Sequence, residues 1–210
     1  MIVLDGIYYA LALAAAAGLV TWAAGPWFAA PLWILAAFCL YFFRDPERAI
    51  PTGNVAVSPA DGKVVAVKPE DLTLNRVSIF LNIFDVHVNR APIAGAISKV
   101  QYQEGRFHVA SREVCSDQNE QNVVTVQGDG TTVIFKQIAG LIARRIVFRK
   151  QPGDHVAAGE RVGLIKFGSR VDVLLGPEWE IVVQPGMRVQ AGSSIIARRV
   201  AGASEGSHES

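Results

Sequence analysis

Gly168 and Ser169 form a pair that can carry chemistry on the chain's own backbone. They follow the strand-like run 164–167, and a glycine before a serine leaves the peptide bond unshielded and allows backbone strain that other residues resist. A serine hydroxyl can attack the carbonyl before it, which moves the acyl group from nitrogen to oxygen. Elimination and hydrolysis then leave a pyruvoyl group. Gly-Ser also occurs at 192–193 and 206–207, so the dipeptide alone does not identify the reactive bond.

A histidine lies among polar residues in the otherwise apolar segment SIFLNIFDVHVNRAP, residues 78–92. If this segment is one extended strand, Asp85, His87 and Asn89 share a face, because side chains alternate along a strand. Burying three such groups is costly unless they form hydrogen bonds or bind a ligand. The cluster is therefore a candidate catalytic site, and a hydrogen-bonded core histidine is the alternative. Asp61, in SPADGKV, is a second candidate, although an aspartate before glycine is also typical of a tight turn.

The part of the chain that carries these residues is predicted to be mostly β. Short runs of alternating apolar and polar residues are separated by Gly, Pro, Asn and Asp, a pattern typical of strands and turns. No segment after residue 48 has a helical apolar stripe longer than three turns. The clearest strand-like runs are 63–68, 76–83, 122–127 and 131–138.

An internal repeat organises this β-rich part. The segments 150–165 and 183–198 share Q-P-G-x-x-V-x-A-G at an offset of 33 residues, and 58–67 and 91–100 are weaker versions. Each copy predicts a turn at Pro-Gly, an inward valine, a second turn at Ala-Gly and a strand. The pattern resembles the half-motifs of biotinyl/lipoyl-like (barrel-sandwich) domains, and it places Gly-Ser 192–193 in an ordinary repeat turn.

Two apolar runs precede the β-rich part. Residues 7–24 and 27–43 are separated by the turn signal Gly25-Pro26, and Asp5 is the only charged residue in 1–43. We therefore expect an N-terminal apolar helical hairpin that associates with a membrane. Pro31 interrupts the second run, so a spanning and a re-entrant hairpin both remain open. The expected organisation is a membrane-anchoring hairpin at 1–48, a β-rich catalytic domain at 49–201 and a flexible tail at 202–210.

Charge and cysteine content exclude several functions. Lys and Arg number 20 against 19 Asp and Glu, so the chain lacks the basic field of a nucleic-acid-binding protein. Two cysteines give no disulfide framework or cysteine zinc site, and no metal site is expected. Arg44 and Arg48 directly follow the second apolar run. The positive-inside rule therefore places the β-rich domain in the cytoplasm, at the inner leaflet of the cell membrane.

Four motifs occur in order: FFRDPER at 42–48, SPADGKV at 58–64, FDVHVNRAP at 84–92 and FGSR at 167–170. Together they resemble the phosphatidylserine decarboxylase proenzymes of the short bacterial and archaeal type. The resemblance implies a lyase that cuts itself between Gly168 and Ser169. Ser169 then becomes the pyruvoyl cofactor of a 42-residue small chain, which stays with the large chain as a heterodimer. The substrate is then a membrane phospholipid, either phosphatidylserine or an archaeal ether-linked analogue.

The resemblance also implies roles for individual residues. Asp61, His87 and Ser169 would serve self-cleavage as orienting group, base and nucleophile. Longer family members have two histidines three residues apart here, and this chain has Arg90 at the second position. His87 then serves both self-cleavage and decarboxylation, or His108 or a shifted alignment supplies the second histidine.

The resemblance further implies a pyruvoyl group that accepts the substrate amine and takes up electrons as CO2 leaves. His87 would protonate the α-carbon. The anionic phosphodiester would bind Arg90, Arg170 or Arg112, although each arginine can equally be a surface or salt-bridged residue. Asn89 is a further candidate substrate-binding residue.

Two other functions remain open from the sequence. A membrane-anchored serine peptidase also has an apolar anchor and a β-rich body, but it needs an activated serine outside Gly-Ser and does not split itself. A non-enzymatic biotinyl-like membrane adaptor explains the repeat and leaves the cluster at His87 unexplained.

Overall fold

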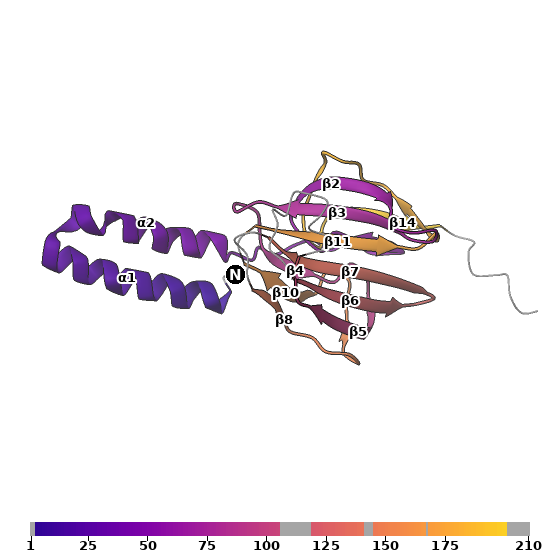
Figure 1. The fold of residues 1–210 in the computed structure, drawn as a ribbon, viewed down its shortest axis with the longest axis horizontal. Coiled ribbons are helices and arrows are strands. Elements are labelled where there is room, and N and C mark those ends of the chain that lie inside the picture. The colour runs from indigo at the N-terminus through magenta and orange to yellow at the C-terminus, as the bar shows by residue number, and fades with distance from the viewer. Residues whose placement is uncertain (1–2, 106–118, 141–144, 167, 201–210) are drawn as a thin grey trace, which may run out of the picture. The chain divides into compact units, whose positions relative to one another are not determined.

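The computed structural model describes residues 3–105, 119–140, 145–166 and 168–200 (Figure 1). The chain divides into two compact units, Met1–Glu47 and Arg48–Ser210. His108, Arg112 and the expected tail at 202–210 lie outside the described residues.

The first unit is the predicted helical hairpin. Helices α1 (Leu4–Ala24) and α2 (Pro26–Phe42) meet at Gly25, whose φ of +99° suits glycine. By length and composition α1 is apolar enough to cross a membrane, whereas α2 is shorter. Pro31 does not interrupt the second helix as expected, because α2 continues through it. A proline within a helix removes one backbone hydrogen bond, and this helix tolerates that loss.

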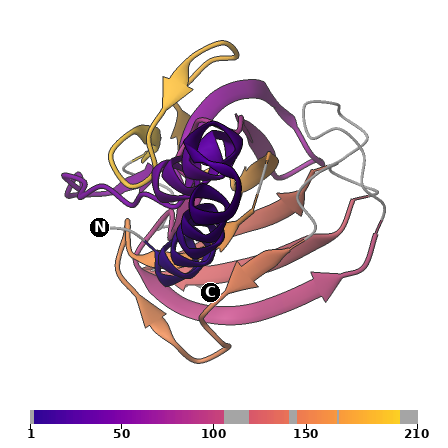
Figure 2. The same ribbon diagram turned by 90° about the vertical axis from the view of Figure 1, so that its left-hand side faces the viewer.

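The second unit is mostly β, as predicted, and no helix follows Phe42 in the part of the chain that the structure describes. Its strands form one curled eight-stranded sheet, in the order β13-β2-β3-β11-β7-β6-β5-β9, and two three-stranded sheets, β1-β14-β12 and β4-β10-β8 (Figures 1 and 2). All pairs are antiparallel. The strands are β1 (Val55–Val57), β2 (Gly62–Pro69), β3 (Asn75–Leu81), β4 (Val88–Arg90), β5 (Gly95–Gln103), β6 (Gln121–Gly128), β7 (Thr131–Ala139), β8 (Ile146–Phe148), β9 (His155–Val156), β10 (Arg161–Ile165), β11 (Ser169–Leu175), β12 (Trp179–Ile181), β13 (Arg188–Val189) and β14 (Ile195–Arg199).

The expectation of one strand over 78–92 is wrong. Strand β3 ends at Leu81, a turn follows, and β4 begins at Val88. The Asn82 side chain accepts a hydrogen bond from the Phe84 N–H (2.7 Å), and the Asp85 carboxylate accepts one from the Asn82 N–H (2.9 Å). Such local side-chain bonds compete with a strand ladder. The turn therefore removes the shared strand face that the sequence predicted for the polar cluster.

The internal repeat extends through the whole second unit. A shift of 33 residues relates the pair β1–β14 to β4–β10 and the pair β2–β13 to β5–β9. Two hydrogen bonds are equivalent under the same shift. The Val57 N–H donates to the Pro92 carbonyl, and the Arg90 N–H donates to the Pro59 carbonyl. The order of the large sheet is mirrored about its central strands β11 and β7. The unit therefore consists of two interlocked halves related by an approximate two-fold axis.

The two repeat turns meet at Ile50. Gly159 and Gly192 occupy equivalent positions with φ of +73° and +78°, and a Cβ on either would lie within 3 Å of the Ile50 side chain. Gly159→Ala is expected to lower the free energy of unfolding by about 2 kcal/mol, through backbone strain and this contact. Gly153→Ala is the control, because Gly153 has a φ of +97° and nothing within 4 Å of its Cβ position. Its expected loss is about 1 kcal/mol. Denaturant unfolding compares the two, and equal losses would contradict the packing role of Gly159.

Candidate active site

Ser169 lies at the start of β11, in the centre of the curled sheet. Its backbone is opposite Leu81 of β3 and Ala139 of β7. It is two residues from the core residue Val171, so its side chain points to the same inner face. The residue is fully buried, and its Oγ has no hydrogen-bond partner among the described residues. Gly168 precedes it with a φ of +62°, a left-handed conformation that favours glycine. The buried Ser169 hydroxyl, which has no hydrogen-bond partner among the described residues, therefore directly follows a glycine in an unusual backbone conformation.

His87 is positioned at this peptide. Its Nε2 accepts a hydrogen bond from the Gly168 N–H (3.2 Å), and its Nδ1 lies 2.9 Å from the Asp85 carbonyl oxygen. A carbonyl only accepts hydrogen bonds, so Nδ1 carries the hydrogen and Nε2 presents its lone pair. The Ile165 N–H of β10 also donates to the His87 carbonyl, and this bond fixes His87 against that strand. A buried neutral imidazole therefore places a basic nitrogen at the residue that precedes Ser169.

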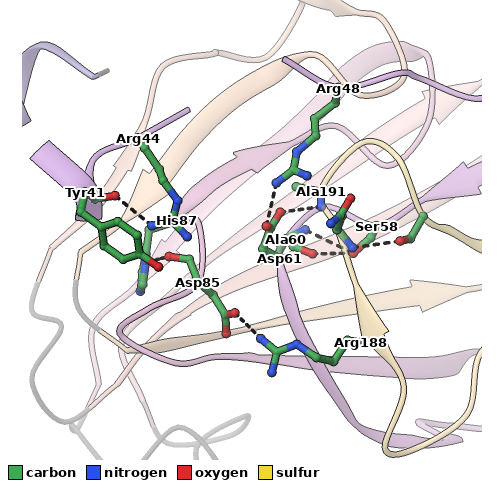
Figure 3. A network of polar contacts seen from close by, with 12 residues as sticks. Tyr41, Arg44, Arg48, Ser58, Ala60, Asp61, Asp85, His87, Arg188 and Ala191 are labelled. Atoms are coloured by element: carbon green, nitrogen blue, oxygen red, sulfur yellow. Dashed lines mark hydrogen bonds and ion pairs between the residues drawn. The ribbon is translucent and has the colours of Figure 1, made fainter. Parts of the chain in front are cut away.

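Asp85 stabilises the turn that carries His87. One carboxylate oxygen accepts the Asn82 N–H, and the other forms an ion pair with Arg188, whose side chain is 64% exposed (Figure 3). The carbonyl of Asp85 orients the imidazole of His87, whereas its carboxylate points toward Arg188. Sequence reasoning noted Asp85 but missed Arg188, which is about one hundred residues away along the chain.

Asp61 lies in the turn before β2. Its carboxylate accepts hydrogen bonds from the Arg48 side chain and from the Ala191 N–H, both at 2.8 Å. Figure 3 shows it beside these groups and apart from His87. The turn that contains Asp61 nevertheless reaches β4, the strand that begins directly after His87, because the Arg90 N–H donates to the Pro59 carbonyl. Of the three residues expected to act together, the structure places His87 beside the Gly168–Ser169 peptide.

The three expected substrate-binding residues in the described chain are all buried. The Asn89 amide lies 3.5 Å from the Pro59 carbonyl. The Arg90 guanidinium donates to the Gly159 carbonyl at 3.0 Å. The guanidinium of Arg170 donates to Asp172 (2.7 Å) and Ser78 (2.6 Å). These contacts tie each side chain to the protein.

A chain of buried amides runs along the inner face near Ser169. Gln137 donates to the Asn89 side-chain oxygen (2.8 Å), and Asn122 donates to the Gln137 oxygen (3.1 Å). Gln137 lies opposite Val171, the inward residue two positions after Ser169. The sequence analysis did not identify Gln137. A signal was present, since this polar residue continues the inward-facing series of Val133 and Phe135. In the described chain, no group of three or more His, Cys, Asp and Glu side chains is placed to hold a metal ion.

Comparisons with known proteins agree on one family. The family model for phosphatidylserine decarboxylase matches residues 35–197. A phosphatidylserine decarboxylase proenzyme of Solibacter usitatus is 78% identical over 199 residues, which cover 95% of this chain and 97% of the relative. Proenzymes of the same name from Saccharopolyspora erythraea and Cupriavidus taiwanensis are 47% and 44% identical, over 78% and 83% of this chain and 74% and 84% of the relatives.

Proposed function

Because the chain belongs to the phosphatidylserine decarboxylase family, we propose that it cuts itself between Gly168 and Ser169 and then converts phosphatidylserine to phosphatidylethanolamine and CO2. Family membership makes it a carboxy-lyase, and it does not support a serine peptidase or a non-enzymatic adaptor. The observation that carries the proposed site is the contact between His87 Nε2 and the Gly168 N–H beside the buried Ser169 hydroxyl.

Self-cleavage begins at the Ser169 hydroxyl. Its Oγ attacks the Gly168 carbonyl carbon. His87 Nε2 releases the Gly168 N–H, takes the hydroxyl proton and passes it to the peptide nitrogen, which leaves as an amine. This produces an ester between the two residues. Elimination then releases residues 1–168 with a new carboxylate, and water displaces ammonia from the remaining residue 169 to leave a pyruvoyl group. The conformation of Gly168 and the absence of a Cβ at this residue favour the attack.

The surroundings of Ser169 fit a pyruvoyl group. The serine hydroxyl has no partner among the described residues, so its loss when the side chain becomes a methyl group leaves no hydrogen-bond partner of that hydroxyl unpaired. Leu81 and Val171 provide an apolar, water-excluding wall on the same face. When formed, the group supplies a ketone that takes the substrate amine and withdraws electrons from the bond to the carboxylate. His87 Nε2 then holds the proton that is delivered to the substrate α-carbon.

Other residues support this site indirectly. We propose that Asp61 is a positioning residue, because its carboxylate holds the turn that is bonded to β4, the strand directly after His87. Asn89 and Arg90 fix the same strand from the other side and shape the space for the substrate. Arg170, the residue after Ser169, is ion-paired with Asp172 and hydrogen-bonded to Ser78, and so fixes the start of β11.

The sheet order explains how two chains would stay together after the cut. The small chain begins with β11, which is paired on both sides with strands of the large chain, β3 and β7. Its strands β13 and β14 pair with β2 and β1. Cutting before Ser169 therefore removes one peptide bond and leaves every one of these ladders in place, which favours a stable heterodimer.

The hairpin is proposed to hold the enzyme at the cell membrane, with the β-rich unit on the cytoplasmic side. This placement depends on the apolar helix α1 and on Arg44 and Arg48, which follow the second helix. We further propose that the two interlocked halves are organised as in biotinyl/lipoyl-like (barrel-sandwich) domains, because the Q-P-G segments recur at equivalent strands.

Release of CO2 from phosphatidylserine labelled in the serine carboxyl group tests the function directly. The processed full-length protein in detergent is expected to release labelled CO2 and to leave phosphatidylethanolamine. Diacyl and diether substrates, compared at equal concentration, identify the lipid class that the enzyme prefers. Absence of CO2 release from both substrates by fully cut protein would contradict the proposed function.

A further inference from the structure

We propose that the turn Asn82–Asp85, called the docking turn below, inserts Ile83 and Phe84 into the surface of an anionic bilayer. The catalytic unit would then bind the membrane itself, beside His87, in addition to any anchoring by the hairpin. This inference rests on the proposed function, since a phospholipid substrate must pass from a bilayer to Ser169.

The docking turn holds apolar side chains outward. Phe84 is 62% exposed and Ile83 is 37% exposed. The turn is tied by hydrogen bonds from the Phe84 N–H to the Asn82 side chain, from the Asn82 N–H to Asp85, and from the Asp85 N–H to the Asn82 carbonyl. An exposed aromatic ring forgoes the favourable free energy of burial. A rigid turn that holds two apolar side chains at the surface offers a face for contact with an apolar partner.

The docking turn lies next to the active site. The carbonyl of Asp85, its last residue, orients His87 through Nδ1, as Figure 3 shows. His87 in turn contacts Gly168. Only two residues of chain separate the exposed Phe84 from the side chain of the catalytic histidine, which places the apolar contact surface at the site that the lipid must reach.

Exposed basic side chains beside the docking turn, Lys63 and the Asp85-paired Arg188, favour an anionic lipid surface as the partner. Arg188 pairs with Asp85 and leaves 64% of its side chain exposed. Lys63, which is exposed, lies opposite Arg188 in the pairing of β2 with β13. Apolar residues that enter the acyl region beside basic residues at headgroup level are typical of membrane-surface contacts. Phosphatidylserine carries the complementary negative charge.

Activity on two forms of one substrate tests the docking turn. Phe84→Ser is expected to lower kcat/KM about tenfold for phosphatidylserine in phosphatidylglycerol vesicles, and to change it less than about twofold for monomeric short-chain phosphatidylserine. Phe84→Leu is expected to restore most of the vesicle activity. An equal loss on both substrates would overturn the proposal, because it would mean that Phe84 only supports the site.

Leu72 offers a matched control. It is fully exposed in the turn before β3, which Asp71 holds through hydrogen bonds from the Thr73 and Leu74 N–H groups, and it lies at the opposite end of β3 from Phe84. Leu72→Ser is expected to leave activity on both substrates unchanged. A loss of vesicle activity equal to that of Phe84→Ser would mean that any exposed apolar residue has this effect, and would overturn the proposal.

Photo-cross-linking separates lipid from protein partners. A benzophenone amino acid at position 84 is expected to form adducts with lipid in vesicles of phosphatidylcholine and phosphatidylglycerol, and the same group at position 72 is not. No lipid adduct at position 84, or adducts with protein alone, would overturn the docking turn. If fully cut wild-type protein instead releases no CO2 from phosphatidylserine in either form, the proposed function fails, and cross-linking still tests the docking turn independently.

Discussion

Ser169→Ala is expected to remain one uncut chain of 22.6 kDa and to release no CO2 from phosphatidylserine. The substitution removes the hydroxyl that attacks Gly168 and also the atoms from which the pyruvoyl group forms. Because the Ser169 hydroxyl is buried and has no partner among the described residues, its removal leaves no donor or acceptor of the protein unpaired, and the fold is expected to persist. Denaturing electrophoresis and the CO2 assay measure the two effects on the same material.

Ser193→Ala is the matched control for this experiment. Ser193 also follows a glycine with positive φ, but it lies in the repeat turn just before β14. In that turn its N–H donates to the Gln190 carbonyl. This variant is expected to be cut and active as the wild type is. A cut Ser169→Ala protein, or an uncut Ser193→Ala protein, would show that the wrong Gly-Ser bond has been assigned.

His87→Gln is expected to slow self-cleavage by about 10²–10⁴-fold, the usual contribution of a positioned general base. Glutamine keeps a polar side chain that can accept from the Gly168 N–H, but it cannot take a proton. The fraction of cut chain over time, measured by electrophoresis, reports the first role of His87. CO2 release per mole of small chain reports the second, and we expect it to fall by a similar factor.

The two readouts separate the roles that the sequence left open for His87. His155→Gln is the control, because His155 is exposed on β9, the strand equivalent to that of Arg188. It is expected to change neither readout. If His87→Gln is cut at the wild-type rate and loses only turnover, another residue is the base for self-cleavage, and the assignment of His87 to that step is wrong.

Local patterns predicted most of the fold. The apolar runs around Gly25 indicate the two helices, and alternation over 63–68, 122–127 and 131–138 indicates β2, β6 and β7. The 33-residue repeat predicts equivalent strands in two halves, and the pairings confirm it. These features depend on residues near one another in sequence, or on a repeated motif, so a single sequence reveals them.

The site was harder to predict because distant residues assemble it. Asp61 accepts a hydrogen bond from Ala191, which is 130 residues away, and no local sequence pattern predicts that contact. The turn after Leu81 was missed because apolar residues continue through 78–92, while the decisive bonds come from the Asn82 and Asp85 side chains. The pairing of His87 with Gly168 joins two motifs that were each recognised separately, and only the folded sheet shows that they meet.

The intact mass of the small chain from active wild-type protein tests the central claim most directly. We expect a 42-residue polypeptide, 169–210, that is lighter by one ammonia than the peptide with an N-terminal serine and that is blocked to Edman degradation. Reduction with cyanoborohydride in the presence of an amine is expected to add that amine to residue 169. An unmodified serine at that position, or an uncut chain in protein that turns over substrate, would contradict the account.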